Sequence, residues 1–394
     1  MKKLISMLVT VALAVTSVFA LAGCNKADDG FKVGAIYINS QNDTSGYTYA
    51  HHKGITEGMK KAGLDPAKDL FIVDNVPEDK EKVKQAIDQL AGNGCDIIFG
   101  ISFGYIDAFE EKAAEYPDII FSHATGYKSN DKNFNNYFGR IYQARYLAGI
   151  AAGYKSLALG NNNIGYVSAW GTEYAETCSG INAFAMGCMA VNPDAQISVY
   201  EIYTWGDQEK ERMAAETLID TYGCGVIAQH CDSAQPQIVA NEKGAFGCGY
   251  NSDMTNEAPD AHLTAPIWNW DAYYATAIKA AMENPATFMN TVGNYYEGLN
   301  AGLVDVSALS KNCEPNTQTS IDAAKKLMKD GEWDVFSGTK LVFDPASGSF
   351  TKVEEPLKTN DGTDIVGAGG ASVDDGVIQG TMNYSVEGVT QVNN

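Results

Sequence analysis

The sequence predicts an α/β protein with two doubly wound parallel-sheet lobes that are joined by a hinge. Short apolar runs alternate with amphipathic helical segments, a pattern that is typical of βαβ units around a parallel sheet. The pattern begins at Phe31 and restarts at about Arg145, which indicates two lobes of similar plan. The chain has 394 residues, enough for two domains with sizeable cores.

In the first lobe, four apolar strands alternate with three helices. Gly63 and the Gly-Asn-Gly of residues 92–94 supply stop signals for the first two helices. The expected elements are strand Phe31–Ile38, helix Tyr47–Ala62, strand Leu70–Val73, helix Glu78–Leu90, strand Asp96–Phe99, helix Tyr105–Glu115 and strand Pro117–Ser122.

The second lobe repeats this alternation. Its expected elements are helix Arg145–Leu157, strand Asn163–Ser168, helix Tyr174–Ala190, strand Ile197–Tyr203, helix Gln208–Tyr222, strand Gly225–Gln229, helix Ala234–Glu242 and strand Ala245–Tyr250. A further helix, Ala272–Met282, continues the alternation along the chain. Further on, Lys340–Phe343 and Gly348–Val353 flank Asp-Pro-Ala-Ser-Gly and predict a hairpin. The Gly- and Asp-rich residues 362–380 predict a loop. We expect residues 31–140 plus about 271–310 to form lobe 1, and 141–270 plus about 311–394 to form lobe 2.

The first residues predict export and lipidation. Lys2 and Lys3 precede the almost wholly apolar stretch Leu4–Ala20, which is typical of a signal peptide over residues 1–23. The ending Leu-Ala-Gly-Cys resembles a bacterial lipobox, so Cys24 is the expected lipidation site and 24–30 a polar tether. The alternative is a single membrane-spanning anchor at the same place. No later stretch approaches the roughly 20 apolar residues that span a bilayer. The protein is therefore expected outside the cytoplasm, held at the cell membrane by its lipid.

The composition argues against several classes of partner and site. The formal net charge is −21, from 28 Lys and Arg against 49 Asp and Glu, and such a surface repels nucleic acid and anionic lipid. The five His and eight Cys include neither CxxC nor HxxxH spacing, so no metal site is expected. The seven Cys after Cys24 are expected to be buried as small apolar residues, although a disulfide stays open.

Two lobes on a tether suggest that a small molecule is captured between them by hinge closure. Ligands of parallel sheets bind at the carboxyl ends of strands. The aromatic side chains expected at those ends are Tyr47, Phe103, Tyr105, Trp170 and Trp268. They can stack on a planar ring or a sugar face.

Polar candidates follow the same strands. Asp232 and Asp253 each come after a strand, and a carboxylate accepts N–H or hydroxyl donors. Asp232 could either cap the next helix or contact a ligand. For Asp253 a ligand contact is the favoured interpretation. His51 is a candidate hydrogen-bond donor in the cleft.

Sequence motifs along the mature chain resemble the basic membrane protein family of substrate-binding lipoproteins, which are similar to purine nucleoside receptors of ABC importers. The segment Thr44–Gly54 resembles the branch with Gly-Trp-(Thr/Ser)-x-x-His-x-x-Gly after the first strand. The other matching stretches are Ser102–Asp107, His123–Tyr127, Tyr137–Gly149, Ile181–Gly187, Gly249–Met254 and Met382–Val389. The resemblance implies a type I periplasmic-binding-protein fold.

The resemblance also implies a purine-like ring stacked between aromatic side chains of both lobes. Tyr47 takes one face, with Phe184 or Trp170 opposite. Thr48 stands where other members carry Asn. The implied contacts at the ring edge are Asn182 and Asp232.

At the sugar end, Asp253 matches the residue that takes ribose hydroxyls in nucleoside-binding members. Those members carry a Lys shortly afterwards, whereas residues 264–270 here read Thr-Ala-Pro-Ile-Trp-Asn-Trp. A cation is lost and indoles are gained, which favours a free purine base over a nucleoside.

Other functions remain as alternatives. A monosaccharide receptor of the same fold would also use aromatic and carboxylate side chains, and a sensor or adhesin without transport is not distinguished by sequence. An enzyme such as a nucleoside hydrolase is not expected, because no Gly-x-Ser-x-Gly elbow, P-loop or dinucleotide motif is present. We expect a monomer without cofactor that works with the permease and ATPase of an importer.

Overall fold

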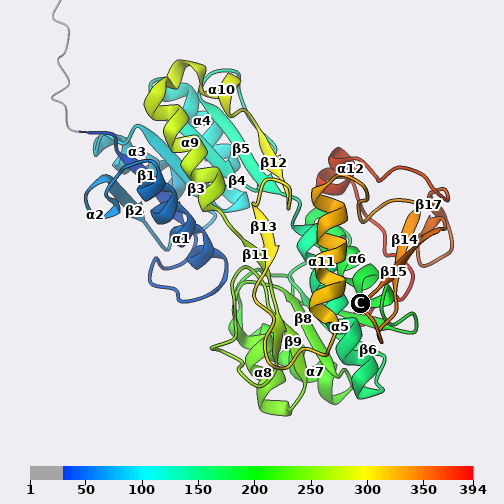
Figure 1. Cartoon of the computed structure of the whole chain (residues 1–394). Coiled ribbons are helices and arrows are strands. Elements are labelled where there is room, and N and C mark those ends of the chain that lie inside the picture. Colours follow the sequence, from blue (N-terminus) through cyan, green and yellow to red (C-terminus); the bar gives the residue numbers. More distant parts are fainter. Residues whose placement is uncertain (1–29, 394) are drawn as a thin grey trace, which may run out of the picture. The chain divides into compact units, whose positions relative to one another are not determined.

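The computed structural model describes residues 30–393 and contains two six-stranded parallel sheets. This architecture confirms the predicted α/β class, and Figure 1 shows the helices packed around both sheets. The predicted signal peptide, the lipidation site Cys24 and the tether up to residue 29 lie outside the described residues. No helix among the described residues is long and apolar enough to cross a membrane.

The first sheet has the strand order β12-β5-β4-β3-β1-β2, and all of its pairs are parallel. We call this sheet and the helices on it lobe 1. Its strands are β1 (Val33–Tyr37), β2 (Leu70–Val73), β3 (Ile97–Ile101), β4 (Ile120–Ala124), β5 (Phe134–Gly139) and β12 (Tyr295–Glu297). Its helices are α1 (Gly46–Lys61), α2 (Pro66–Asp69), α3 (Lys80–Gly92), η1 (Phe103–Tyr105), α4 (Ile106–Glu115), α9 (Asp271–Glu283), η2 (Pro285–Thr287) and α10 (Phe288–Thr291).

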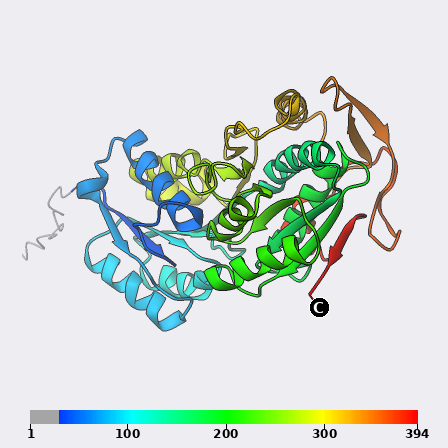
Figure 2. The same ribbon diagram turned by 90° about the horizontal axis from the view of Figure 1, so that it is seen from below.

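Strand β3 shows why both faces of the first sheet are covered. Its residues are fully buried apolar or glycine, with no polar face. Ile97 and Phe99 point into the core shared with α1 and α9, whereas Ile98 points into the core shared with α3 and α4. Successive side chains of a strand face opposite sides, so a continuous apolar run needs helices on both. Figure 2 shows these two helix layers with the sheet between them.

The second sheet has the order β10-β9-β8-β6-β7-β18 and is also parallel. We call it and its helices lobe 2. Its strands are β6 (Asn163–Ser168), β7 (Gln196–Glu201), β8 (Val226–His230), β9 (Phe246–Cys248), β10 (His262–Thr264) and β18 (Val389–Gln391). The helices on this sheet are α5 (Ile141–Leu159), α6 (Ala175–Met189), α7 (Gln208–Asp220) and α8 (Gln235–Lys243), and α11 (Thr317–Lys329) packs on α5.

The chain passes between the two sheets at three places: from β5 into α5, from β10 towards α9, and after β12. The second and third passages pair with each other as the antiparallel strands β11 (Pro266–Trp268) and β13 (Val304–Val306), which lie between the lobes in Figure 1. Because the lobes are built from interleaved stretches of chain, a hinge at this place consists of these three chain segments, two of which pair as β11 and β13. The lobe boundaries given above stay a prediction.

The C-terminal part decorates lobe 2. The predicted hairpin is confirmed as β14 (Thr339–Phe343) paired antiparallel with β15 (Phe350–Glu354). The prediction of a continuous loop over 362–380 is wrong, because β16 (Leu357–Lys358) pairs with β17 (Asp364–Val366) and α12 (Asp375–Gly380) follows. The side chain of Asp374 caps α12 by accepting from the N–H of Val377.

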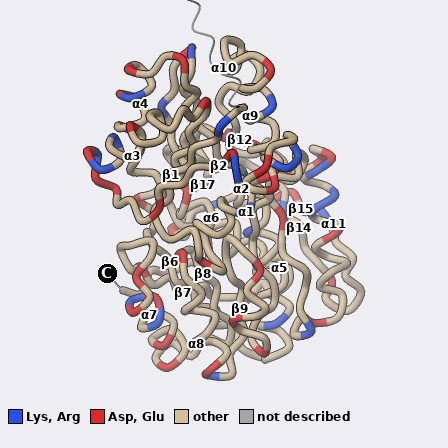
Figure 3. Tube along the Cα trace, turned by 90° about the vertical axis from the view of Figure 1, so that its left-hand side faces the viewer, with Lys and Arg blue, Asp and Glu red and all other residues tan. Residues whose placement is uncertain are grey.

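The seven cysteines of the described chain are free thiols. Six are buried and Cys313 is partly buried, which confirms the expectation that they fill space in the core. Acidic positions are spread over the elements of both sheets (Figure 3), in line with the net charge.

Candidate ligand-binding site

The amino end of α1 lies against lobe 2. The backbone N–H of Gly46, the first residue of α1, donates to Ser252 Oγ at 3.1 Å. Gly46 has a φ of 84°, and a Cβ there would lie 2.1 Å from the backbone oxygen of Asp232. Only glycine allows so close an approach at this conformation. The helix that carries Tyr47, Thr48 and His51 therefore begins at the contact between the lobes.

Four rings pack against one another in a continuous row that we call the aromatic wall, in which His51 and Trp270 are 0% and 1% exposed: Tyr47, His51, Trp270 and Trp268. The edge of one ring meets the face of the other between Tyr47 and His51, with centroids 4.5 Å apart. His51 stacks on Trp270 at 4.4 Å, and Trp270 stacks on Trp268 at 4.3 Å. Gly54 makes this possible, because a Cβ there would lie 2.3 Å from Trp270 Cβ. The structure thus joins three sequence-predicted residues, Tyr47, His51 and Trp268, through Trp270.

Some buried polar atoms in and beside the aromatic wall have no hydrogen-bond partner within the described protein. His51 Nδ1 lies 2.7 Å from the hydroxyl of Tyr274, but His51 Nε2 has no hydrogen-bond partner. Trp270 Nε1 and Thr48 Oγ1 are likewise buried without a partner. Burial lowers the pKa of His51 well below its usual value, so the ring is neutral. Since buried polar groups are normally satisfied, these atoms can pair with a small polar molecule.

Lobe 2 presents Asp232 towards this wall. Asp232 follows β8, and Asn251 links it to the wall, since Asn251 Nδ2 lies 3.4 Å from Asp232 Oδ1 and Trp268 Nε1 donates to Asn251 Oδ1 at 3.1 Å. Burial, followed by the charges of Asp232 and Tyr250, raises the pKa of Tyr47 well above its usual value. Tyr47 of lobe 1 therefore faces the ends of two lobe 2 strands.

The protonation of Asp232 differs from that of a surface carboxylate. Burial is the largest cause that raises its pKa well above the usual value, and the nearby carboxylates Glu211 and Glu176 add to the effect. A protonated carboxyl donates one hydrogen bond and still accepts others. In its protonated form Asp232 would donate to an acceptor atom of a ligand, and in its ionised form it would accept from an N–H or hydroxyl group.

A buried polar cluster lies beside Asp232 in lobe 2. Glu176 Oε1 lies 2.7 Å from His230 Nε2, and the guanidinium of Arg145 lies 3.7 Å from the centroid of the Tyr250 ring. Arg145 Nη1 donates to the backbone oxygen of Gln229 at 2.6 Å. Arg145 and His230 are 1% and 0% exposed. This cluster supplies charges close to Asp232.

A cavity of about 270 Å³ lies between α1 and lobe 2, next to the aromatic wall. It is lined by residues of α1 between 49 and 57, by the loop 251–257 and by residues 267–271. Trp268, Trp270 and Asp253 are among them. The cavity connects the indoles of the wall with the carboxylate that was expected at the sugar end.

Asp253 has a half-exposed side chain that already makes contacts within its loop. Asp253 Oδ1 accepts from the backbone N–H of Thr255 at 2.9 Å and from Thr255 Oγ1 at 2.6 Å. It also lies 3.5 Å from His262 Nε2. The carboxylate thus shapes the loop 251–257 and still reaches the cavity.

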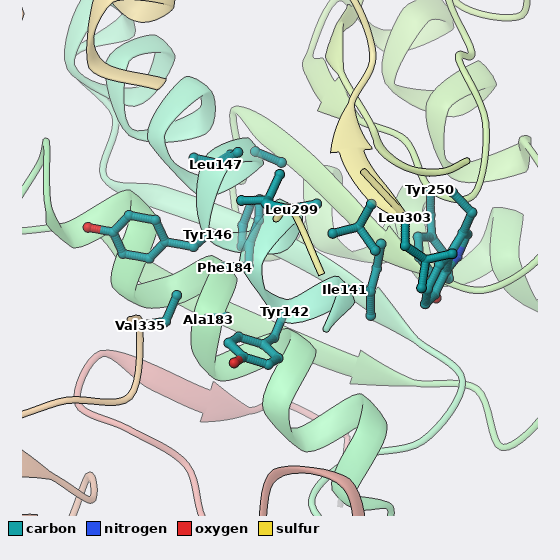
Figure 4. Close-up of a cluster of buried hydrophobic side chains, with 14 of the residues drawn as sticks. Ile141, Tyr142, Tyr146, Leu147, Ala183, Phe184, Tyr250, Leu299, Leu303 and Val335 are labelled. Atoms are coloured by element: carbon teal, nitrogen blue, oxygen red, sulfur yellow. The ribbon is translucent and has the colours of Figure 1, made fainter. Parts of the chain in front are cut away.

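Two other predicted residues lie within lobe 2. Both ends of the Asn182 amide are used by the C-terminal segment, since Nδ2 donates to the oxygen of Tyr384 at 2.8 Å and Oδ1 accepts from the N–H of Val386 at 3.0 Å. Phe184 is 1% exposed and packs in the core between α5 and α6, 5.4 Å from the Tyr166 ring. Figure 4 shows it among the buried side chains of this core. The structure does not bring either residue into the aromatic wall.

Phe103 and Trp170 belong to a second aromatic group at the edge of the lobes. Phe103 is 40% exposed and lies 6.4 Å from Tyr174, which stacks on Trp170 at 5.0 Å. The group crosses from lobe 1 to lobe 2, because Phe103 belongs to η1 and Tyr174 precedes α6.

Sequence reasoning did not place Glu176, His230 or Arg145 near the aromatic wall, and it named Trp270 only as one of the indoles gained in residues 264–270. Trp270 is two residues after Trp268, and Arg145 lies inside the recognised stretch Tyr137–Gly149. The position of Glu176 in the first turn of a helix after a strand was an available signal. In the described part of the chain, no cluster of three or more His, Cys, Asp or Glu side chains is placed to hold a metal ion.

Two interleaved α/β lobes with an aromatic and polar contact between them define a solute-binding protein of the hinged two-lobe class. A family model described as ABC transporter substrate-binding protein, PnrA-like, matches residues 31–334. The chain belongs to this family, the basic membrane protein (Bmp) family. It is thus an extracytoplasmic binding protein, not an enzyme, and binds a small molecule in concert with transporter components.

Comparisons with individual proteins agree with the family. The chain is 33% identical over 377 residues to a purine-binding protein of Brucella abortus (strain 2308), covering 96% of this chain and 98% of the relative. It is 32% identical to a Haloferax volcanii protein provisionally named as an ABC transporter glucose-binding protein, over 80% of this chain and 76% of the relative. A solved solute-binding protein of an ABC transporter from Conexibacter woesei shares the fold, with a TM-score of 0.60 at 18% identity, over 77% of this chain and 98% of that one.

Proposed function

We propose that the chain is the substrate-binding lipoprotein of an ABC importer and captures a purine base, or less readily a nucleoside, between its lobes. The aromatic wall, opposite Asp232 at the lobe contact, carries this proposal. A planar heterocycle offers the wall a face to stack on and offers Asp232 polar atoms at its edge. The relative named as purine-binding, which matches almost the whole chain, supports the same ligand class.

Binding couples to movement of the lobes. With the lobes apart, α1 and the loop 251–257 separate, and a ligand can reach the wall from solvent. Closure brings Gly46 onto Ser252 and Asp232 towards Tyr47, as in the structure. A ligand that contacts both lobes stabilises this closed form by its differential affinity for it. Transporter subunits then have a closed, loaded form to recognise.

A free base is favoured over a nucleoside. Residues 264–270 supply indoles and no Lys at the end of the site where a sugar would lie. Asp253 is the remaining charged candidate there and is committed to Thr255 as well. The ligand is expected to depend more on stacking than on hydroxyl contacts.

A monosaccharide is the second candidate. The 270 Å³ cavity combines indoles with Asn251, Asp253 and Asn256, a mixture that also suits sugar hydroxyls. The relative provisionally named as glucose-binding fits this reading. Anchoring by lipid at Cys24 is proposed from the lipobox-like residues 21–24.

Thermal-shift screening of bases, nucleosides and monosaccharides tests the ligand class, because a ligand that binds only the folded state raises the melting temperature. Calorimetry on Tyr47→Ala tests the wall. Base–aromatic stacking is worth about 1–3 kcal/mol, so the variant should bind the best base roughly tenfold more weakly or worse.

The control for Tyr47→Ala is Tyr222→Ala, at an exposed ring beyond α7. It should leave the affinity unchanged. Monosaccharides that shift the melting temperature while all purines fail to do so would replace the purine proposal. Unchanged base affinity in Tyr47→Ala would remove Tyr47 from the binding surface.

A further inference from the structure

Glu176 is the second residue of α6 in lobe 2. Its side chain is 26% exposed, whereas its partner His230 is fully buried. The amino end of a helix stabilises a negative charge. The ring of His230 lies 4.8 Å from that of Tyr250, and the next residue, Asn251, contacts both Asp232 and Trp268 of the aromatic wall.

His230 holds this carboxylate in one orientation. Burial, followed by the Arg145 charge, lowers the pKa of His230 to about 4, so the ring is neutral at pH 7. A neutral imidazole has one N–H, and an ionised carboxylate can only accept. The 2.7 Å contact therefore places the proton on Nε2, which donates to Glu176 Oε1. Nδ1 is left as the acceptor, 3.4 Å from the hydroxyl of Tyr166.

Glu176 is ionised although it is enclosed. Burial raises its pKa, but His230, Arg145 and Tyr250 together outweigh burial, and the pKa falls below its usual value. The pKa of Asp232 shifts in the opposite direction, well above its usual value, with burial as the largest cause. Carboxyl groups whose pKa values are pushed apart within one site can divide the roles of acceptor and donor. The cleft thus offers Glu176 as a carboxylate that only accepts.

We infer that Glu176, oriented by His230, is the residue that reads the edge of the bound heterocycle by accepting a ring or amino N–H. The inference rests on the proposed function and names a specificity residue for it. Each carboxylate oxygen has two acceptor positions, so the bond from His230 leaves room for a ligand N–H. The nearby charge of the buried Arg145 offsets that of Glu176, which suits a neutral ligand with an N–H donor. Fully N-substituted heterocycles lack that donor, and sugars offer only hydroxyl donors.

The test combines a protein variant with changes to the ligand. Calorimetry would compare the wild type and Glu176→Gln with hypoxanthine and with hypoxanthine methylated singly at N1, N3, N7 and N9. In the wild type, the methyl group that replaces the accepted N–H should weaken binding at least tenfold. In Glu176→Gln, hypoxanthine itself should bind at least fivefold more weakly, and that same methyl group should cost at least threefold less than in the wild type. A steric clash of the methyl group affects both proteins, so only loss of the carboxylate contact produces this difference.

Glu209→Gln is the matched control. Glu209 also lies in the first turn of a lobe 2 helix, α7, but it is exposed. This variant should bind the whole series like the wild type, and the melting temperatures without ligand report whether each variant is folded. Identical methyl costs in the wild type and Glu176→Gln would overturn the inference.

The wild type alone gives a second test that needs no folded variant. If no methyl group weakens its binding by more than threefold, no N–H is read in the cleft and the inference fails. These outcomes differ from failure of the proposed function, in which the wild type binds no purine at all.

Discussion

At the scale of single residues, Asp232 and Asp253 show how neighbouring strand ends give two carboxyl groups different chemistry. Asp232 is enclosed between the lobes, and burial raises its pKa. Asp253 is half exposed and accepts two hydrogen bonds from Thr255. Asp232 therefore lies enclosed at the lobe contact, while Asp253 lines the cavity with its side chain half exposed to solvent.

Asp253→Asn separates the two roles of this carboxylate. Asparagine keeps the Oδ1 acceptor, so the turn to Thr255 and the melting temperature without ligand should be preserved. If the carboxylate contacts ligand, affinity should fall about tenfold, because a charge-assisted hydrogen bond is weakened. Calorimetry measures the affinity for the base that binds most tightly in the thermal-shift screen and for its nucleoside. Thr255→Val is the control, and equal affinity in both variants and the wild type would assign Asp253 to the loop alone.

Sequence reasoning reached the residues whose position follows from strand ends. Tyr47, His51, Trp268 and Asp232 meet at the lobe contact because parallel strands and the helices after them open at one edge. The grouping of Glu176 with His230 and Arg145 was not predicted, since these two residues are 54 and 31 residues away from it in the chain. Such pairing is set by the tertiary structure. Asn182 shows the opposite case: it lies in a motif that predicted ligand binding, but its side chain hydrogen-bonds the C-terminal segment.

At the scale of elements, the predicted helices and strands of both lobes are present, with shifts of a few residues at their ends. The helix predicted from Arg145 begins earlier, at Ile141, and the strand predicted over Ile197–Tyr203 ends at Glu201. β5 was missed because Phe-Asn-Asn-Tyr-Phe-Gly has little apolar alternation, and it is completed by pairing with β4 and β12. The short strands β11 and β13 depend on each other, so neither has a local signal.

Asn182 connects α6 with the segment that leads to β18. Asn182→Ala should lower the free energy of unfolding by about 2 kcal/mol, because the N–H of Val386 and the oxygen of Tyr384 lose buried partners. Denaturant unfolding measures this change. Asn182→Asp keeps the shape and the acceptor but loses the donor, so it should be intermediate. A stability loss below 0.5 kcal/mol together with weaker base binding would place Asn182 at the ligand instead.

At the scale of the whole molecule, buried titratable groups give the stability opposing dependences on pH. Burial lowers the pKa of His123, His230 and His262 to about 4, so these groups cost stability as the pH falls below about 6.5. Glu201 and Glu211 have pKa values raised to about 7, again with burial as the largest cause. Their contributions act in the other direction, so the total stability should vary little between pH 5 and 7.

Glu211→Gln isolates one of these terms. Glu211 is 0% exposed, and the hydroxyl of Ser233 donates to it. Above about pH 4.5 the unfolded chain has released this proton, whereas the native protein holds it up to about pH 7. The native state therefore binds more protons in this window, and the wild type loses stability as the pH rises through it. As the pH rises through this window, the free energy of unfolding of Glu211→Gln should increase relative to that of the wild type by about 1.4 kcal/mol per pH unit. The increase should total roughly 3 kcal/mol and should stop above pH 7. Urea unfolding at several pH values measures the difference, with the exposed Glu209→Gln expected to follow the wild type throughout. A constant difference between Glu211→Gln and the wild type from pH 5 to 8 would show that Glu211 is ionised in the folded protein.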